Sequence, residues 1–434
     1  MKNKLSHVLL YISAVSVAGS GLFFVLKLPS VAGPLLISGL IALASAVRGF
    51  QKLKGFSYTC WILTAVAASM FYPRYFISFG GFQFKTLIVP LLQIIMFGMG
   101  SQMSFKDFSG VIKMPKGVLV GVVSHYMIMP LVGFGIAKIF NFQPEIAAGI
   151  ILIGCVPSGL ASNVMSFMAR ANLALAVTVG AVSTLLSPFV TPLLMKWLGG
   201  QYIEVNFWSM MLDILNMIIL PIVAGFIFNL FAKGGERRSS KIIQLVSYTV
   251  IILLTNLVYV KSKDAGFSDF LIHFAKSMGW FFFLPMFGAM ILSRFIKGEN
   301  KYMEKILSLI SMVGIAVIVT IITASGRDHL LQVGALLMVT SLLHNLVGYT
   351  LGYWLSRLFG MPERDRRTIA FEVGMQNGGL ASGLALQMGK VATVGLAPAI
   401  FGPLMNVTGS ILANFWRGKP IDEDNPKLNE GERA

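Results

Sequence analysis

Long apolar runs separated by short polar loops dominate the chain. A helix needs roughly 20 apolar residues to cross a bilayer core about 30 Å thick. Fourteen runs approach or exceed this length, and the run at residues 57–72 is the shortest. The pattern therefore predicts an all-α polytopic membrane protein with about 14 transmembrane helices. The predicted helices span residues 6–26, 30–48, 57–72, 86–104, 117–140, 146–168, 172–197, 207–232, 242–260, 276–296, 304–324, 330–357, 368–389 and 392–416.

Composition and charge agree with a membrane protein. Only 12% of the 434 residues are charged, whereas soluble proteins carry about 25%. The net charge of +17 would suggest nucleic acid in a soluble chain, but here the basic residues sit in short loops between the apolar runs, with an excess on one side of the membrane, as membrane topology requires. Their distribution predicts a multi-pass protein of the cell inner (plasma) membrane with cytoplasmic N- and C-termini. No nucleic-acid partner is expected.

Other classes of protein are disfavoured. The first apolar run continues into a second without a clear cleavage site, so we interpret it as an uncleaved span. Cys60 and Cys155 both lie in apolar runs and cannot form a disulfide framework. The absence of a phosphate-binding loop argues against an ATP-driven pump. An intramembrane enzyme is also disfavoured, because no Ser/Lys pair, paired aspartates or His-rich metal motif stands out.

Two segments in distant spans resemble one another. Residues 157–163 interrupt the sixth span, residues 374–383 interrupt the thirteenth, and both contain Gly-Leu-Ala-Ser. Each follows a Pro-Glu pair at the start of its helix, Pro144-Glu145 and Pro362-Glu363. Transporters often contain inverted repeats that each carry a broken helix near the membrane midplane. Ordinary small-residue packing faces are the alternative, but two copies beside side-chain amides favour a binding site.

Glu372 lies inside the thirteenth span and is the first candidate for a functional residue. A charge at that depth costs roughly 2.5–3.5 kcal/mol on insertion scales, so a cation, proton or partner must offset it. Gln376 and Asn377 follow at helical spacing. Carboxylate and amide oxygens together form a ligand set for a hard cation. The alternative is a protonated or hydrogen-bonded glutamate with a structural role.

At these residues the chain resembles the bile acid:sodium symporter family. The resemblance covers residues 84–234 and 303–416. Its most specific stretches are residues 94–100, 154–163, 183–188 with 191–192, and 372–377. The family implies a ten-helix core of two inverted five-helix repeats, whose fourth and ninth helices are broken and cross at the binding site. About four extra transmembrane helices would then complete the count of 14.

The resemblance implies a division of the chain. Residues 1–56 would form two extra N-terminal helices, and residues 57–206 the first inverted repeat. The second repeat would occupy residues 207–416, with a two-helix insertion at about 235–302. Residues 417–434 would form a cytoplasmic tail. The Leu-Pro segments in runs 207–232 and 276–296 look alike, and we prefer 207–232 as the sixth core helix because it is closer to the family.

The family's sodium ligands carry over unevenly. By resemblance, Ser162, Asn163 and Glu372 belong to a first sodium site, whose two further hydroxyl residues are replaced here by Ala176 and Gly180. A second site would use Glu372 and Gln376, together with backbone carbonyls near Val373 and Met375. His125 stands where that site has a glutamine. We therefore expect one coupled sodium rather than two.

The leading hypothesis is a secondary active transporter that couples sodium to the symport of a small organic anion by alternating access. Its partners would be the lipid bilayer, the anion and sodium as coupling ion, without any other cofactor. The positive ends of broken helices could meet the carboxylate of the anion, with Ser158, Asn377 and Asn406 as polar contacts. A proton-coupled or uncoupled organic-anion transporter or exporter is the alternative, because Ala176, Gly180 and His125 depart from the family. We expect a structural role for His344, at the roughly equivalent place in the second repeat.

Overall fold

The computed structural model describes residues 2–50, 56–102, 110–233, 238–295 and 301–421. Every apolar run forms helix within this part of the chain. Ten of the described helices are long and apolar enough to cross a membrane, and three shorter apolar helices cover 57–71, 144–155 and 309–325. The protein is therefore an all-α polytopic membrane protein, whereas the total of 14 spans and the inverted repeats stay predictions.

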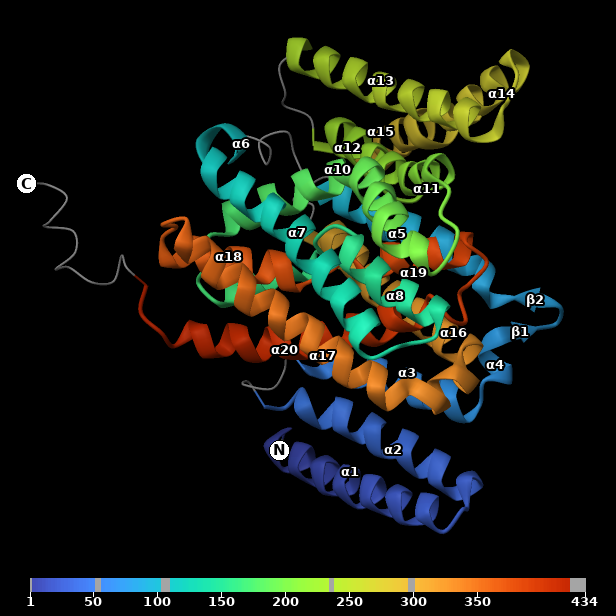
Figure 1. The fold of residues 1–434 in the computed structure, drawn as a ribbon, viewed down its shortest axis with the longest axis vertical. Coiled ribbons are helices and arrows are strands. Elements are labelled where there is room, and N and C mark those ends of the chain that lie inside the picture. Colours follow the sequence, from blue (N-terminus) through green and yellow to red (C-terminus); the bar gives the residue numbers. More distant parts are fainter. Residues whose placement is uncertain (1, 51–55, 103–109, 234–237, 296–300, 422–434) are drawn as a thin grey trace, which may run out of the picture.

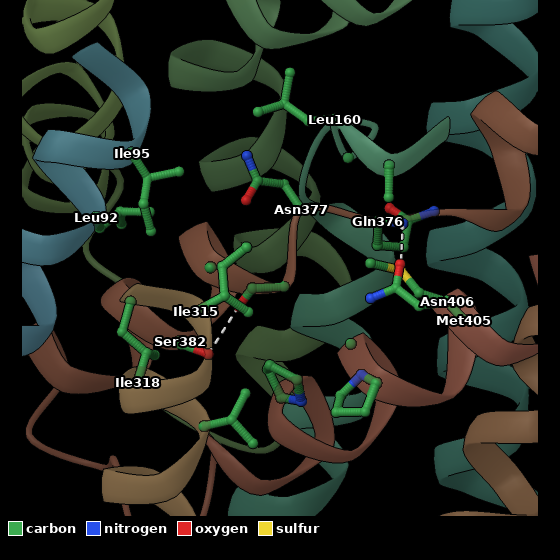
Figure 2. A pocket seen from close by; sticks show the side chains of 18 of the residues that line it. Leu92, Ile95, Leu160, Ile315, Ile318, Gln376, Asn377, Ser382, Met405 and Asn406 are labelled. Carbon is green, nitrogen blue, oxygen red and sulfur yellow. Dashed lines mark hydrogen bonds between the residues drawn. The ribbon is translucent and has the colours of Figure 1, made fainter. Parts of the chain in front are cut away.

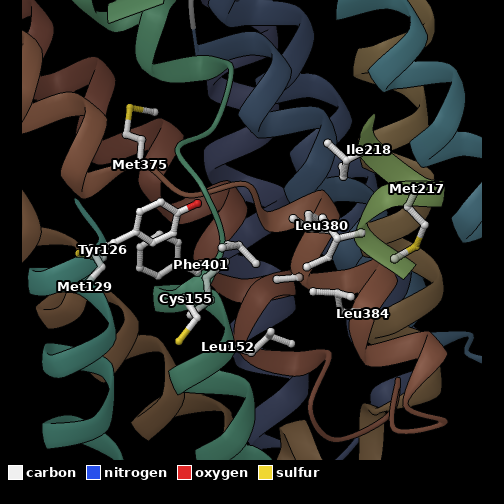
Figure 3. Close-up of a cluster of buried hydrophobic side chains, with 14 of the residues drawn as sticks. Tyr126, Met129, Leu152, Cys155, Met217, Ile218, Met375, Leu380, Leu384 and Phe401 are labelled. Carbon is white, nitrogen blue, oxygen red and sulfur yellow. The ribbon is translucent and has the colours of Figure 1, made fainter. Parts of the chain in front are cut away.

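Eight helices form a bundle at the centre of the molecule, which we call the crossover bundle. They are α7 (Pro115–Ile139), α8 (Pro144–Cys155), α9 (Ala161–Met168), α10 (Leu173–Leu198), α17 (Arg327–Leu358), α18 (Glu363–Gly374), α19 (Gly378–Gln387) and α20 (Leu396–Arg417). The helices α7 to α10 and the helices α17 to α20 follow the same order. Each series consists of a long helix, a helix broken into two halves and a second long helix. Helix α7 packs against α8, α17 and α18, and α20 packs against α8 and α9. Figure 3 shows the apolar side chains that fill the space between the broken helices and their neighbours.

A second group, the outer helices, packs beside this bundle. It consists of α3 (Ser57–Phe71), α5 (Ile88–Gln102), α11 (Phe207–Ile214), α12 (Leu220–Lys233) and α16 (Lys301–Ser325). Small residues let α5 and α12 approach closely, as is common between membrane helices. A Cβ atom on Gly100 would lie only 2.2 Å from the carbonyl oxygen of Ile222, and one on Gly225 only 2.3 Å from that of Phe97.

The helices that the sequence analysis assigns as additional lie at opposite ends of the molecule (Figure 1). At one end, α1 (Lys2–Val25) packs against α2 (Pro29–Val47), which contacts α3. At the other, α13 (Arg238–Lys263) packs against α11 and α12, α14 (Phe267–Met278) packs against α13, and α15 (Leu284–Phe295) packs against α12. In the most apolar stretch of 207–231, 78% of the residues are buried, whereas 17% are buried in that of 267–291. The assignment of 207–232 as the sixth core helix stays a prediction.

The two Leu-Pro segments also share a local distortion. A π-helical turn at Leu215–Ile219 precedes Pro221, and another at Gly279–Phe283 precedes Pro285. Proline has no N–H to donate to the preceding turn and its ring crowds the carbonyl there. A π-turn widens the helix just before the proline, which explains why the sequence likeness is accompanied by a structural one.

Short elements connect the helices. They are α4 (Arg74–Ile77), strands β1 (Ser78–Phe79) and β2 (Phe82–Gln83), 3-10 turns at Phe84–Leu87 and Gly199–Gln201, and α6 (Gly110–Lys113). The strands pair antiparallel, with Ser78 opposite Gln83. Gly80 and Gly81 form the turn at φ values of +55° and +84°, which glycine adopts without strain. Our sequence analysis did not predict this hairpin, because each strand has only two residues.

The C-terminal tail begins later than expected. Helix α20 ends at Arg417, but Ile421 is buried and the guanidinium of Arg367 donates to the carbonyl oxygen of Pro420 at 2.9 Å. The segment after the helix is thus held against the bundle. Residues 422–434 of the expected tail lie outside the described residues.

Candidate functional site

The two broken helices cross at their breaks. Helix α8 ends at Cys155 and α9 begins at Ala161, while α18 ends at Gly374 and α19 begins at Gly378. The Gly159 N–H donates to the Met375 carbonyl at 3.0 Å, and the Asn377 N–H donates to the Pro157 carbonyl at 2.9 Å. The backbone groups released by each break are therefore satisfied by the other break, as they must be at membrane depth. The two similar segments of the sequence meet here.

Local sequence explains why the helices break at these points. Pro157 has no N–H and disfavours helical geometry in the residue before it, so α8 stops there. The side chain of Asn377 accepts from the Leu380 N–H at 3.0 Å and caps the start of α19. Gly159 is required by close approach, because a Cβ atom would lie 2.5 Å from the Gln376 carbonyl oxygen.

Glu372 lies one turn before the crossing and is fully buried. Its Oε1 accepts a hydrogen bond from the Ser162 hydroxyl at 2.5 Å. Its Oε2 is buried without a hydrogen-bond partner among the described residues. Buried polar atoms are nearly always paired, and a buried carboxylate without a counter-charge is costly. This oxygen is therefore suited to a bound cation.

Two further predicted ligands present unpaired oxygens. Asn163 Oδ1 and Gln376 Oε1 are buried and lack hydrogen-bond partners within the described part of the chain. The Gln376 side-chain N–H donates to the Val373 carbonyl at 2.7 Å, and the Met375 carbonyl already accepts from Gly159. Free acceptors thus occur at both predicted sodium sites, Asn163 Oδ1 at the first and Gln376 Oε1 at the second, whereas the carbonyls expected for the second site each already accept one hydrogen bond from the protein.

The ring of His125 lies between the two broken helices. Its Nδ1 is 2.9 Å from the Glu372 carbonyl oxygen, and its Nε2 is 2.9 Å from the Val156 carbonyl oxygen. A neutral imidazole has a single N–H, so only one of these contacts can be an ordinary hydrogen bond. The ring therefore connects one broken helix directly to the other. His344 instead contacts the backbone of α7, with Nε2 2.9 Å from the Met129 carbonyl, and its structural role stays a prediction.

A cavity of about 100 Å³ adjoins the crossing. Figure 2 shows Asn377 and Asn406 at this cavity, with Leu92 of α5 and Ile315 of α16 among the apolar side chains that face it. The first residues of α19 also line it. Ser158, which we expected beside the substrate, is not among the lining residues. Its hydroxyl lies 3.3 Å from that of Ser162 and therefore belongs with the Glu372 cluster.

Sequence reasoning missed part of this cavity. Ser382 lines it and donates to the Gly378 carbonyl at 2.7 Å. The second Gly-Leu-Ala-Ser copy was the available signal, since Ser382 ends it as Ser162 ends the first. The two serines nevertheless face different partners. The apolar wall formed by Ile315 and Ile318 carries no signal in the sequence, because isoleucines occur throughout the spans.

Comparison with known proteins shows which family of proteins this chain is similar to. The model of the Sodium Bile acid symporter family matches residues 89–267. The sodium-dependent transporter YocS of Bacillus subtilis (strain 168) is 32% identical over 374 residues, which cover 86% of this chain and 94% of that protein. The probable sodium/metabolite cotransporter BASS1 of Arabidopsis thaliana is 29% identical, covering 75% of this chain and 65% of the relative. The rice BASS1 protein is 26% identical, covering 92% and 81%. These relatives are named as transporters, and this chain is a transporter rather than an enzyme.

Proposed function

Since the chain belongs to the sodium bile acid symporter family, we propose that it couples sodium entry to the symport of a small organic anion by alternating access. The observation that carries this proposal is the crossing itself. Unpaired buried oxygens for a cation lie on one side of it, and a cavity lined by amides lies beside it. A cation and an anion bound at one crossing would each favour binding of the other.

The cavity suits a compact carboxylate with an apolar tail. Gln376, Asn377 and Asn406 offer amide donors, and Gly379 lies in the first turn of α19. N–H groups in that turn lack intrahelical acceptors and carry the positive end of the helix dipole. Leu92, Ile95 and other apolar residues form the remaining wall. Among the residues that the structure describes, no lysine or arginine lines the cavity, so dipoles and the neighbouring cation would balance the negative charge.

In this proposal the cation is sodium, and Ser162, Asn163 and Glu372 hold it. The second family site is disfavoured in this chain, because the carbonyls of Val373 and Met375 already accept hydrogen bonds from protein donors. We therefore propose one coupled sodium. The protein would lie in the plasma membrane with both termini in the cytoplasm, as the distribution of basic residues favours.

The proposal is tested by reconstituting the purified protein in vesicles. Uptake of a panel of small organic anions is measured with an inward sodium gradient and with choline in place of sodium. At least one anion should accumulate above its equilibrium level only when the sodium gradient is present. Failure of every anion to respond to sodium, with protein that is folded and inserted, would contradict the proposal.

The alternative of a proton-coupled or uncoupled transporter rests on one specific observation. His125 places its ring between two backbone carbonyls at the position where the family has a glutamine. In the same vesicles, accumulation under an inward proton gradient without sodium would favour proton coupling. Equilibration without accumulation under either gradient would favour an uncoupled carrier or exporter.

A further inference from the structure

A second cavity, of about 300 Å³, lies between α5, α9, α10 and α12. Leu160 lines this cavity as well as the smaller one beside the crossing. Gln102, at the end of α5, is among its lining residues. Asn163 and Gly180 line it too, so the cavity touches a predicted sodium ligand and a position where this chain departs from the family.

Gly180 separates the second cavity from Glu372. An added Cβ atom at this glycine would lie 3.5 Å from Glu372 Oε2, and apart from its own turn of helix no other atom of the described residues would lie within 4 Å. This is the carboxylate oxygen that has no hydrogen-bond partner among the described residues. The unpaired Oε2 of Glu372 therefore faces Gly180, which is the glycine among the residues that line the second cavity.

Neighbouring hydroxyls on α10 cannot replace the missing one. Ser183 and Thr184 donate to the Gly180 carbonyl, at 3.0 Å and 2.7 Å. Thr178 donates to the Ala174 carbonyl at 2.8 Å, and its side chain packs against Gly110. The helix thus directs each of these hydroxyls to backbone oxygens, and none to Glu372.

We propose that Gly180 opens the Glu372 site to water from the second cavity, and that this glycine sets the affinity and ion selectivity of the site. The inference rests on the proposed function and names what completes its cation shell. Ser162, Asn163 and Glu372 supply three side-chain oxygens, fewer than a dehydrated sodium ion requires. Water reaching the ion past Gly180 supplies the rest. Ion selectivity depends on the number and rigidity of the coordinating oxygens, so a partly hydrated site discriminates weakly by ion size.

Sodium binding to purified protein tests the inference without relying on transport. The shift in melting temperature is measured against NaCl, LiCl and KCl at constant ionic strength, with choline as the balancing cation. Gly180→Ser places a hydroxyl oxygen beside the carboxylate, where it can coordinate the ion. The half-saturating sodium concentration should then fall about fivefold, a change similar in size to the net contribution of one hydrogen bond. Selectivity for sodium over lithium and potassium should increase. Gly180→Ala fills the same space without an oxygen and should raise the half-saturating concentration.

Control variants separate ion effects from helix effects. Both substitutions remove a glycine from a helix and raise its intrinsic stability. Gly135→Ser does the same in α7, where an added Cβ has no neighbour within 4 Å, and it should leave sodium binding unchanged. Gly180→Cys should react with a small water-soluble thiol reagent, and sodium should slow the reaction. The natural cysteines Cys60 and Cys155 are both buried, so wild-type protein should react little.

The outcomes distinguish the inference from the proposed function. If wild-type protein shows no sodium-specific shift, the sodium site and this inference both fail. If wild-type protein responds to sodium while Gly180→Ser and Gly180→Ala keep its half-saturating concentration and selectivity, the inference alone is wrong. An inert Gly180→Cys in folded protein would equally contradict access by water.

Discussion

The backbones of Ser158 and Gln376 pair as an isolated antiparallel β-bridge at the crossing of the broken helices. This pairing joins two segments that lie far apart in the sequence and satisfies peptide groups that would otherwise be unpaired inside the membrane. Because Glu372 and His125 contact the same two segments, a small displacement at the bridge would change both the cation site and the substrate cavity.

The bridge depends on Gly159. We expect Gly159→Ala to abolish sodium-driven uptake and to destabilise the protein by roughly 1–3 kcal/mol, as overpacking does, because its Cβ would lie 2.5 Å from the Gln376 carbonyl. Uptake and melting temperature measure the two effects. Gly200→Ala is the control, since open space surrounds that glycine. Normal uptake by Gly159→Ala would show that the close approach is dispensable.

Glu372 is the residue on which the cation site depends most. Gln is nearly the same size and can still accept from Ser162, so Glu372→Gln should fold. It should lose sodium stimulation of uptake and the sodium-dependent rise in melting temperature. Without sodium, its melting temperature should equal or exceed that of the wild type, because a costly buried charge is removed. Full sodium-stimulated uptake by this variant would disprove the site assignment.

Much of this arrangement could be predicted from the sequence, and the reasons are physical. Apolar run length predicted the helices, and Pro157 with the repeated Gly-Leu-Ala-Ser indicated where two of them break. Partners in space could not be predicted. Ser158 and Asn377 both flank a break, yet one hydroxyl faces Ser162 while the other side chain lines the cavity. The direction of a side chain at a break depends on φ and ψ values that lie outside regular helix periodicity.

Stoichiometry gives a further prediction. With the second-site carbonyls engaged and His125 in place of glutamine, the sodium dependence of uptake should have a Hill coefficient near one. His125→Gln introduces the glutamine that the family resemblance implies at this position and removes a ring that links both breaks. Its Hill coefficient should rise above one if the second site then binds sodium. Initial uptake rates over a range of sodium concentrations provide the measurement. A coefficient near two in the wild type would contradict single-sodium coupling.

Alternating access should change the exposure of the crossing. In a background where Cys60 and Cys155 are replaced by serine or alanine, cysteine is introduced at Asn377, which lines the cavity, and in a separate variant at Ser158, which is buried. Saturating sodium or substrate should alter the rate at which a membrane-impermeant reagent labels Asn377→Cys. Ser158→Cys should label more slowly throughout. If sodium and substrate leave the labelling rate of each variant unchanged, the crossing does not line a gated cavity.

The additional helices at the two ends of the molecule have a mechanical consequence. Helices α1 and α2 attach through α3, and α13 to α15 attach through α11 and α12, so both additions widen the outer helices (Figure 1). A wide body displaces more lipid when it shifts and meets greater viscous drag than a narrow one. In any relative motion of the two groups, we therefore expect the widened outer helices to move less within the membrane than the crossover bundle does.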